Sequence, residues 1–479
     1  MSVTAEQRAR RAAEPSADQA AGMSRRGSRR AVRGWWRDGV GAATWASVLV
    51  VTALWVAGGG LQDLGSWGPR LTSLGRLSAL LASDLLLLQV LLMARIPVVE
   101  RAYGQDELAR KHRLVGFWSF NLLVAHIVAI IIGYAAQDRN NVFLEAWQLV
   151  VDYPGMLLAV AGTVLLVMVT VTSIRKARRK LRYESWHLLH LYAYLGVGLA
   201  LPHQLWSGKE FMTSTVATVY WWSLWAAAAA AVVVWRLGVP LYRTLLHDLR
   251  VIDVVRETPD VVSVWMRGRH LDRLPVAAGQ FLTWRFLTGP GWSRGHPYSL
   301  SAAPTGDTLR ISVKDLGDDS HVLSNLRAGT RVVVEGPYGR LHGGVRTRRK
   351  VTLLGSGVGI TPLRALLEDL PQGPGDVTLL YRASSAQDLV FRSEIDALAE
   401  ANGARVFYIV GPRVSDRSSW LPHTAGHLSD VQALHELVPD IEEHDVYVCG
   451  ASAWMDAARD AALAAGVPPA HIHLERFSW

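Results

Sequence analysis

Four histidines in two apolar segments have the residue type and the spacing to bind haem iron. His112 and His126 are fourteen residues apart, and His190 and His203 are thirteen apart. At a rise of 1.5 Å per residue, each gap spans roughly 20 Å of a hydrocarbon layer about 30 Å thick. If both segments run outward, His112 lies level with His190, and His126 with His203. Each pair could ligate one haem from both faces, which predicts two haem b groups stacked across a membrane.

The angular positions fit the first segment better than the second. At 100° per residue, a gap of fourteen returns to within about 40° of the same helix face, whereas a gap of thirteen ends about 140° away. Pro202 directly precedes His203. Because proline removes a backbone hydrogen bond, it could kink or rewind this turn and bring His203 to the required face.

Several ionisable residues in these segments have alternative interpretations. His112 stands in a basic stretch and could be a loop residue, and His187 lies one turn before His190 and competes with it as a ligand. His126 is in mid-segment, where an ionisable side chain usually marks function. Asp84 lies in another apolar run and either pairs with an arginine or lines a proton path; both readings stay open.

The histidines belong to a set of long apolar runs, most of which precede about residue 240 of the 479-residue chain. We predict a six-helix transmembrane bundle followed by a water-soluble half. Lys and Arg gather in the loops after the second and fourth spans, so the positive-inside rule places both termini in the cytosol of a multi-pass protein of the cell membrane. A basic tail, residues 1–38, is expected to be disordered. The predicted spans are about 40–59, 71–96, 114–135, 155–174, 186–206 and 216–239.

Charge and cysteine content narrow the function further. The net charge of +9 comes largely with basic residues that flank apolar spans, so no nucleic-acid partner is expected. The single cysteine, Cys449, excludes a disulfide within the chain, a Cys-ligated iron–sulfur cluster and a Cys-based zinc site. A redox cofactor must therefore be held by histidine or bound non-covalently.

The second half of the chain contains two patterns. Short β-branched runs separated by Gly and Pro turns predict an antiparallel β-barrel or sandwich. From Lys350 onward, alternating strands and helices predict a parallel α/β sheet of Rossmann-like type. The expected domains are a haem-binding membrane domain at 39–240, a β-barrel domain at 241–345 and a nucleotide domain at 346–479.

One stretch, GHPYSLSAAP at Gly295–Pro304, followed by VKDLGDDSHVL and EGPYGR, resembles the flavin domain of the ferredoxin-reductase superfamily. The His-Pro-Tyr-Ser form is similar to the membrane ferric reductase and NADPH oxidase branch. The resemblance implies that Tyr298 stacks on the isoalloxazine, Ser299 hydrogen-bonds the flavin and His296 serves the ribityl–phosphate part. The FAD-binding residues that it implies are His296, Pro297, Tyr298, Ser299, Lys314 and Ser320.

A glycine-rich turn, GSGVGITP, follows a strand and opens a helix, where main-chain amides can approach a pyrophosphate. It resembles the nicotinamide-binding turn of the same superfamily. Arg382, with help from Arg413, stands where a ribose 2′-phosphate would lie, which favours NADPH with NADH as the alternative. The nucleotide-binding residues expected are Gly355, Gly357, Gly359, Thr361, Pro362, Arg382, Arg413 and Gly450.

The end of the chain supplies the expected catalytic residues, Cys449, Glu475 and Phe477. In relatives, the Cys-Gly pair lines the nicotinamide pocket, although a buried small hydrophobe is the alternative reading of Cys449. Relatives also end in Glu-x-Phe, whose aromatic ring covers the flavin, and Glu475 and Phe477 match this ending. The chain continues to Trp479, which leaves open which ring stacks.

The resemblance implies electron transfer from cytosolic NADPH through FAD, an inner haem (His112, His190) and an outer haem (His126, His203). FAD is needed because it accepts a two-electron hydride and releases single electrons. The acceptor on the outer face is a ferric chelate or dioxygen, the latter giving superoxide. The alternative is a cytosolic flavin reductase on a membrane anchor, or an electron donor to an extracytoplasmic partner protein. The pattern of the chain leaves its oligomeric state open.

Overall fold

The computed structural model describes residues 35–178, 181, 183–289, 291–292, 294–315, 317, 320–371, 373–415 and 417–476. The chain divides into two compact units at the boundary between Gly238 and Val239. The first helix begins at Trp35, four residues inside the stretch predicted to be disordered. Phe477 and Trp479, the two candidates for covering the flavin, lie outside the described residues.

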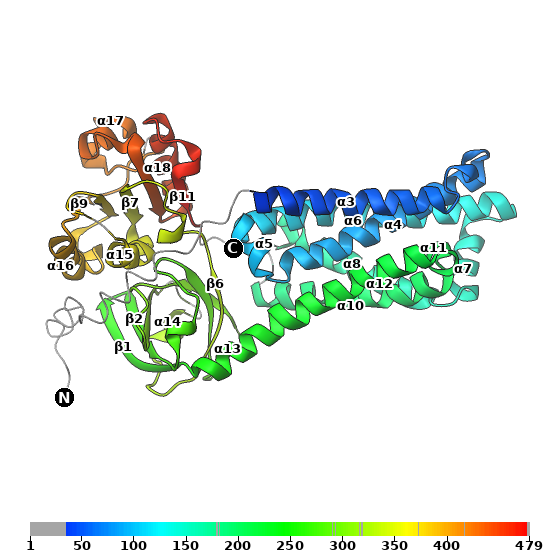
Figure 1. The fold of residues 1–479 in the computed structure, drawn as a ribbon, viewed down its shortest axis with the longest axis horizontal. Helices are drawn as coiled ribbons and strands as arrows, with labels where there is room; N and C mark the ends of the chain where they lie inside the picture. Colours follow the sequence, from blue (N-terminus) through cyan, green and yellow to red (C-terminus); the bar gives the residue numbers. More distant parts are fainter. Residues whose placement is uncertain are drawn as a thin grey trace. The chain divides into compact units, whose positions relative to one another are not determined.

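The first unit is a bundle of long helices that lie side by side (Figure 1). Five helical stretches are long and apolar enough to cross a membrane: Trp35–Ala57, Trp67–Met93, Glu107–Asp138, Met156–Ser173 and Thr215–His247. The fifth predicted span, 186–206, corresponds to a helix of 25 residues that is not among these five. The long helices are α3 (Trp35–Ala57), α4 (Trp67–Met93), α6 (Gln105–Asp138), α8 (Met156–Ser173), α10 (Tyr183–Ser207) and α12 (Thr215–Ala231).

Short helices that the pattern of apolar runs did not predict connect the long ones. They are α5 (Pro97–Tyr103), α7 (Val142–Asp152), α9 (Arg175–Arg178) and α11 (Lys209–Thr213). A π-helical segment (Val232–Gly238) and α13 (Val239–His247) continue α12. The unit boundary therefore falls inside one continuous helical stretch.

Small residues let the helices of the bundle approach closely. α4 packs along α6, and α8 packs along α10. A Cβ atom built on Gly162 of α8 would lie 2.6 Å from the carbonyl oxygen of Gly196 of α10, so this crossing requires glycine. Such close backbone contact replaces the hydrophobic driving force that helices lack inside a lipid layer.

The second unit begins with two three-stranded antiparallel sheets, which pack around a shared apolar core. The strand orders are β1-β2-β5 and β4-β3-β6. Isolated bridges connect them at Leu300–Ile311 and at Arg250–Arg331. The strands are β1 (Arg250–Thr258), β2 (Val261–Arg267), β3 (Phe281–Phe286), β4 (His296–Ser299), β5 (Thr308–Lys314) and β6 (Val332–Tyr338), with the short helix α14 (Ser320–Leu323) after β5.

A five-stranded parallel sheet follows, which confirms the predicted α/β architecture. Its order is β11-β10-β7-β8-β9, with β7 in the centre (Figure 1). The strands are β7 (Lys350–Ser356), β8 (Val377–Ala383), β9 (Arg405–Val410), β10 (His444–Cys449) and β11 (Ile472–Leu474). The helices are α15 (Ile360–Asp369), α16 (Arg392–Asn402), α17 (Asp430–Leu437) and α18 (Ser452–Ala464); α17 was not predicted.

Candidate functional site

The structure brings His112 of α6 and His190 of α10 together. Their ring centroids are 6.0 Å apart and the ring planes differ by 64°. An iron atom held between two imidazole nitrogens, at about 2 Å from each, requires ring centroids about 6 Å apart. His112 lies well inside α6, which excludes the alternative that it belongs to a loop. This geometry fits two axial ligands of one haem.

His126 and His203, the predicted second pair, lie fourteen and thirteen residues further along the same two helices. The two rings are near enough to interact electrostatically. α10 is continuous through Pro202, so the chain reaches this pairing without a break in the helix. The main chain of His203 packs against Gly155, where a Cβ atom would lie 2.8 Å from the His203 nitrogen.

Oxygen atoms of neighbouring helices hold the ring orientation of three of the four histidines. The Nδ1 atom of His126 lies 2.9 Å from the carbonyl oxygen of Gly75, and that of His112 lies 3.4 Å from the carbonyl oxygen of Gln89. The Nδ1 atom of His190 lies 3.3 Å from Ser173 Oγ. Histidines that bind metals usually donate the other ring N–H to such an acceptor, which leaves Nε2 for the metal.

The four histidines suit a haem better than a bare metal ion. Within the described part of the chain, no group of three or more His, Cys, Asp or Glu side chains could hold a metal ion. A pair of imidazoles supplies only two ligands, and a porphyrin supplies the rest. His187 also lies near His190. The ring of His190 packs against Trp186, with ring centroids 5.1 Å apart.

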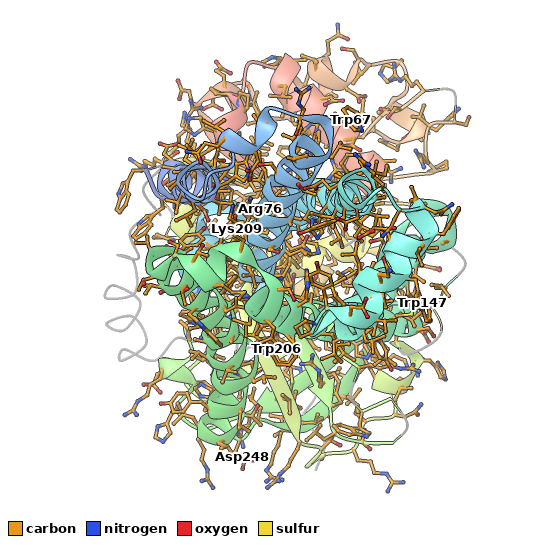
Figure 2. All side chains as sticks on the ribbon, turned by 90° about the vertical axis from the view of Figure 1, so that its right-hand side faces the viewer. Trp67, Arg76, Trp147, Trp206, Lys209 and Asp248 are labelled. Atoms are coloured by element: carbon orange, nitrogen blue, oxygen red, sulfur yellow. The ribbon has the colours of Figure 1, made fainter. Side chains whose placement is uncertain are left out.

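Several ion pairs lie at the end of the bundle that carries α7 and α11. Arg76 pairs with Glu210 at 2.5 Å and with Asp63 at 3.2 Å, and Lys209 lies 3.9 Å from Asp63. Arg76 directly follows Gly75, whose carbonyl faces His126. Figure 2 looks onto this end and shows Arg76 and Lys209 close together. Three tryptophans with exposed rings lie around them: Trp67, Trp147 and Trp206.

The predicted flavin motif forms β4, at one edge of its sheet. Alternation along the strand puts His296 and Tyr298 on one face, and their rings are parallel within 10°, with centroids 5.9 Å apart. Ser299 points the other way and is 5% exposed, and its hydroxyl has no hydrogen-bond partner among the described residues. An orphaned buried hydroxyl is rare in native proteins, so it fits a group that the flavin would complete.

The two residues predicted for the FAD pyrophosphate have protein partners in this structure. Lys314 forms an ion pair with Asp260 at 3.0 Å. Ser320 begins α14 and donates to the Asp315 carboxylate at 3.2 Å and to the Gly317 carbonyl at 2.7 Å. Both are near the end of β5, and a pyrophosphate would have to compete with these carboxylates.

The predicted nucleotide turn connects β7 to α15 at the carboxyl edge of the parallel sheet. Gly357 has a φ of +54°. A Cβ atom on Gly359 would lie 2.3 Å from the Cys449 carbonyl oxygen, and one on Gly450 would lie 2.9 Å from the Ser356 Cβ. Thr361 and its neighbour Pro362 are buried in the first turn of α15. These close approaches explain the glycines and leave main-chain amides at a helix N-terminus, where a pyrophosphate binds well.

Arg382 lies at the carboxyl end of β8, next to Ser356 of the nucleotide turn in the ladder. Its side chain is 6% exposed, and in the described part of the chain its guanidinium bonds to the main-chain carbonyls of Ala383 and Pro412. Burial lowers the pKa of Arg382. A buried cation beside carbonyls but no carboxylate fits an anionic ligand. Arg413 lies nearby but is exposed.

Cys449 and Glu475 come together at the end of β10. Burial, together with the charge of Glu475, raises the pKa of the Cys449 thiol well above its ordinary value. The thiol is therefore protonated at neutral pH and is a poor nucleophile. The Glu475 carboxylate packs over Gly339, where a Cβ atom would lie 2.3 Å from Oε1.

A buried ionic network joins the β domain to the nucleotide domain. No sequence motif predicted it. Both terminal nitrogens of Arg310 (β5) bond the two Glu394 oxygens (α16) at 2.9 Å, and Nη2 donates to the Ser301 carbonyl at 2.7 Å. Arg364 of α15 also forms an ion pair with Glu394 at 2.9 Å. Burial opposes ionisation of Glu394, but the two guanidiniums outweigh it and lower its pKa.

The same helix α15 binds the segment that follows the flavin strand. Glu368 accepts the main-chain N–H of Ala303 at 2.7 Å and pairs with Arg364. α15 therefore carries the nucleotide turn at its start and an anchor to the flavin-motif segment along its body. Only long-range contacts, not a local pattern, could reveal this anchor.

Fold and site together define a membrane-type oxidoreductase in which a helical unit with paired histidines precedes a two-domain reductase. Residues 78–201 match the family described as ferric reductase like transmembrane component, and residues 353–460 match the oxidoreductase NAD-binding domain. The two matches together correspond to a ferric-reductase-like fusion, in which such a transmembrane component is joined to a ferredoxin-reductase-type FAD/NAD domain.

Curated relatives match about half of the chain. The ferredoxin reductase component of 3-ketosteroid-9-alpha-monooxygenase from Mycolicibacterium smegmatis is 32% identical over 240 residues, which cover 48% of this chain and 65% of that protein. The match thus spans less than two thirds of that relative. A flavohemoprotein from Vibrio cholerae is 30% identical over 286 residues, which cover 57% of this chain and 68% of that protein.

A solved structure matches a similar share of the chain. It is the FAD/NAD binding domain of nitric oxide dioxygenase from Vibrio cholerae, which is 31% identical with a TM-score of 0.40. The match covers 48% of this chain and 98% of that one.

Proposed function

We propose that this protein carries electrons across the membrane, from NADPH through FAD and two b-type haems to a small acceptor on the outer face. The acceptor is a ferric chelate or dioxygen. The observation that carries the proposal is the 6.0 Å separation of the His112 and His190 rings. His126 and His203 follow on the same two helices and are the proposed second pair. Two stacked ligand pairs have no use in a mere membrane anchor.

The proposed membrane domain, 39–240, has six spans, with α10 as the fifth in order and both termini in the cytosol. At 1.5 Å per residue, the 25 residues of α10 reach about 37 Å, enough to cross a bilayer. The lower apolarity of α10 is what a helix with three histidines in the bundle interior would show. His112 and His190 then face the cytosolic side, and His126 and His203 face the outside.

The proposed FAD domain, 241–345, is a closed six-stranded barrel, which is supported by the two bridges that connect the edges of its sheets. Tyr298 offers a stacking face for the isoalloxazine, the buried Ser299 hydroxyl hydrogen-bonds the flavin, and His296 binds its ribityl–phosphate part. Lys314 and Ser320 bind the pyrophosphate after giving up Asp260 and Asp315.

The proposed nucleotide domain, 346–479, binds NADPH at the Gly355–Pro362 turn. Arg382 pairs with the 2′-phosphate, helped by Arg413, while Cys449 and Gly450 line the nicotinamide pocket. Glu475 acts beside Cys449, and the ring of Phe477 or Trp479 covers the flavin. Bound FAD supplies the conversion of a two-electron hydride into single electrons, and haem supplies one-electron carriage.

A second candidate function is a flavin reductase on a membrane anchor, or an electron donor to a partner protein. It is favoured by relatives whose names describe reductase components of multi-protein oxygenases. If the membrane unit is only an anchor, the histidine pairs would bind no haem.

A visible spectrum of the purified full-length protein separates the two. The proposal expects a b-type haem spectrum whose bands change when NADPH is added. It also expects that His126→Ala and His203→Ala abolish reduction of a membrane-impermeant acceptor but leave reduction of a soluble dye by NADPH. A flavin spectrum without haem would establish the second candidate. Rates with a ferric chelate, measured against superoxide formation in air, identify the acceptor.

A further inference from the structure

Asp84 is a carboxyl group at 0% exposure in the middle of α4, and its partners are hydroxyl groups. Ser47 of α3 and Tyr220 of α12 each lie 2.7 Å from Asp84 Oδ1, and the two hydroxyls lie 2.7 Å from each other. The Oδ2 atom has no hydrogen-bond partner among the described residues. No ion pair of Asp84 occurs there either, so the alternative of an arginine partner is excluded for this part of the chain.

The helices around Asp84 bring little charge toward it. Beyond Asp38, α3 contains no ionisable residue, and Tyr220 is the only one in α12. α4 itself carries Arg70 and Arg76 toward its start. The remaining neighbour, α6, contributes His112, His126 and Tyr134 at bundle depth, with its charged residues in its first turns and at Asp138. The apolar core beside the carboxyl includes Leu80, Leu87, Val51 and Trp221.

The position of Asp84 along α4 relates it to both histidine pairs. The same helix presents the Gly75 carbonyl to His126 and the Gln89 carbonyl to His112. Asp84 lies between these levels, and at 100° per residue it is turned about 140° to 180° away from those two carbonyls. Ser83 also accepts a hydrogen bond from Gln204, the residue after His203, at 3.3 Å. The carboxyl therefore lies on the side of α4 that faces away from the histidines proposed to bind the two haems.

An isolated carboxylate in such surroundings is costly, and so is an added electron. A charge moved into a low-dielectric interior loses its hydration, and two negative charges there repel each other strongly. A group that binds a proton when an electron arrives keeps the net charge of the interior constant. A carboxyl with two hydroxyl partners can serve this purpose, because each hydroxyl can turn to donate to the carboxylate or to accept from the acid.

We propose that Asp84, with Ser47 and Tyr220, is a proton-binding site coupled to electron entry into the membrane unit. The inference rests on the proposed function. One electron from the oxidation of NADPH enters the proposed haems, and one proton from solvent forms an O–H bond with the Asp84 carboxylate. When the electron leaves for the acceptor, that O–H bond breaks and the proton returns to solvent, so the cycle leaves no net charge behind.

The test is a redox titration of the full-length, haem-loaded protein across a range of pH. In the wild type, the haem midpoint potential falls as pH rises, with a slope approaching that of one proton per electron. In Asp84→Asn this slope disappears. Glu145→Gln, which changes another buried carboxylate of the same unit, keeps the wild-type slope. An unchanged slope in Asp84→Asn overturns the proposal.

Infrared difference spectroscopy on a pH step gives a readout independent of haem. The wild type shows the carbonyl stretch of a protonated carboxylic acid that Asp84→Asn lacks; the same band in both proteins overturns the proposal. If Asp84→Asn does not fold, Ser47→Ala and Tyr220→Phe replace it. Each removes a donor to the ionised form, so the pH range of the slope moves to higher pH, and an unmoved range overturns the proposal.

Three other results can be told apart from these. A wild-type protein that binds haem but has a pH-independent potential contradicts the proton site and leaves the proposed function standing. Absence of haem contradicts both. A potential that responds to Na⁺ at fixed pH but not to pH assigns the site to a cation and overturns the proton proposal.

Discussion

The rings of His112 and His190 lie 6.0 Å apart although their helices pack along different neighbours, α6 along α4 and α10 along α8. Each helix pair thus contributes one imidazole, and the two rings lie close together between the pairs. This arrangement makes the inner ligand assignment directly testable.

Replacing either His112 or His190 with alanine is expected to lower haem content from two groups per chain to one, because a single imidazole cannot replace two axial ligands. Haem extraction and a redox titration that resolves one centre instead of two would measure the loss. His187→Ala is the matched control one turn away and should keep both haems. Loss of a haem in His187→Ala, with retention in His190→Ala, would reverse the assignment.

Ser299→Ala should act in opposite directions on the empty and the flavin-loaded protein. Without FAD, its buried hydroxyl has no partner in the described chain, so its removal leaves stability unchanged or higher. With FAD, the lost hydrogen bond should weaken binding by roughly five- to tenfold. Fluorescence titration of FAD and thermal unfolding of the apoprotein measure the two effects.

Ser312→Ala is the control for Ser299, since its hydroxyl is equally buried but bonded to Ser263 at 2.6 Å and to Ser301 at 2.7 Å. It should destabilise the protein and leave FAD affinity within about twofold. Equal effects of the two substitutions on FAD affinity would show that Ser299 does not touch the flavin.

Arg382→Gln is expected to raise the KM for NADPH by roughly 10- to 100-fold, the worth of a charge-assisted hydrogen bond to phosphate. The KM for NADH should change little, because NADH has no 2′-phosphate. Steady-state reduction of a soluble dye measures both values. Arg405→Gln, at the opposite end of the sheet, should alter neither. A parallel rise for both nucleotides would mean that Arg382 serves structure and not cofactor choice.

The surroundings of Asp445 predict that the folded protein loses stability in acid. Burial opposes ionisation of its carboxylate, but the bond with His473 Nε2 at 3.1 Å and the N–H groups of Arg348 and Thr347 at 2.6 and 2.7 Å outweigh it and lower its pKa. A depressed folded pKa stabilises the fold above the unfolded value of about 4, and this stabilisation is lost as pH falls below it.

Asp445→Asn should therefore lower the Tm at pH 7 by several degrees, and the difference from the wild type should shrink below about pH 4. The release of bound flavin on heating measures this unfolding transition. A difference that stays constant from pH 7 to pH 3 would contradict the role of this carboxylate. Asp460→Asn, an exposed carboxylate on α18, is the control.

Spacing in the sequence predicted that His112 and His190 lie at one level, because residue number along a helix gives depth, and their rings lie 6.0 Å apart. The oxygens that orient the rings could not be predicted, since Gly75, Gln89 and Ser173 belong to other helices. The Arg310–Glu394 bond crosses 84 residues for the same reason. The short helix α7 was missed because eleven residues are too few to read as a span.

Helix α15 links the two halves of the reductase more tightly than a flexible joint would. Its first turn follows the Gly-rich loop, while Arg364 and Glu368 hold Ser301 and Ala303 beside the flavin strand. We therefore expect nucleotide binding to affect the absorbance of the bound flavin. A nucleotide that displaces α15 when it binds should alter the absorbance of oxidised flavin before any electron has moved, even with an analogue that cannot be oxidised.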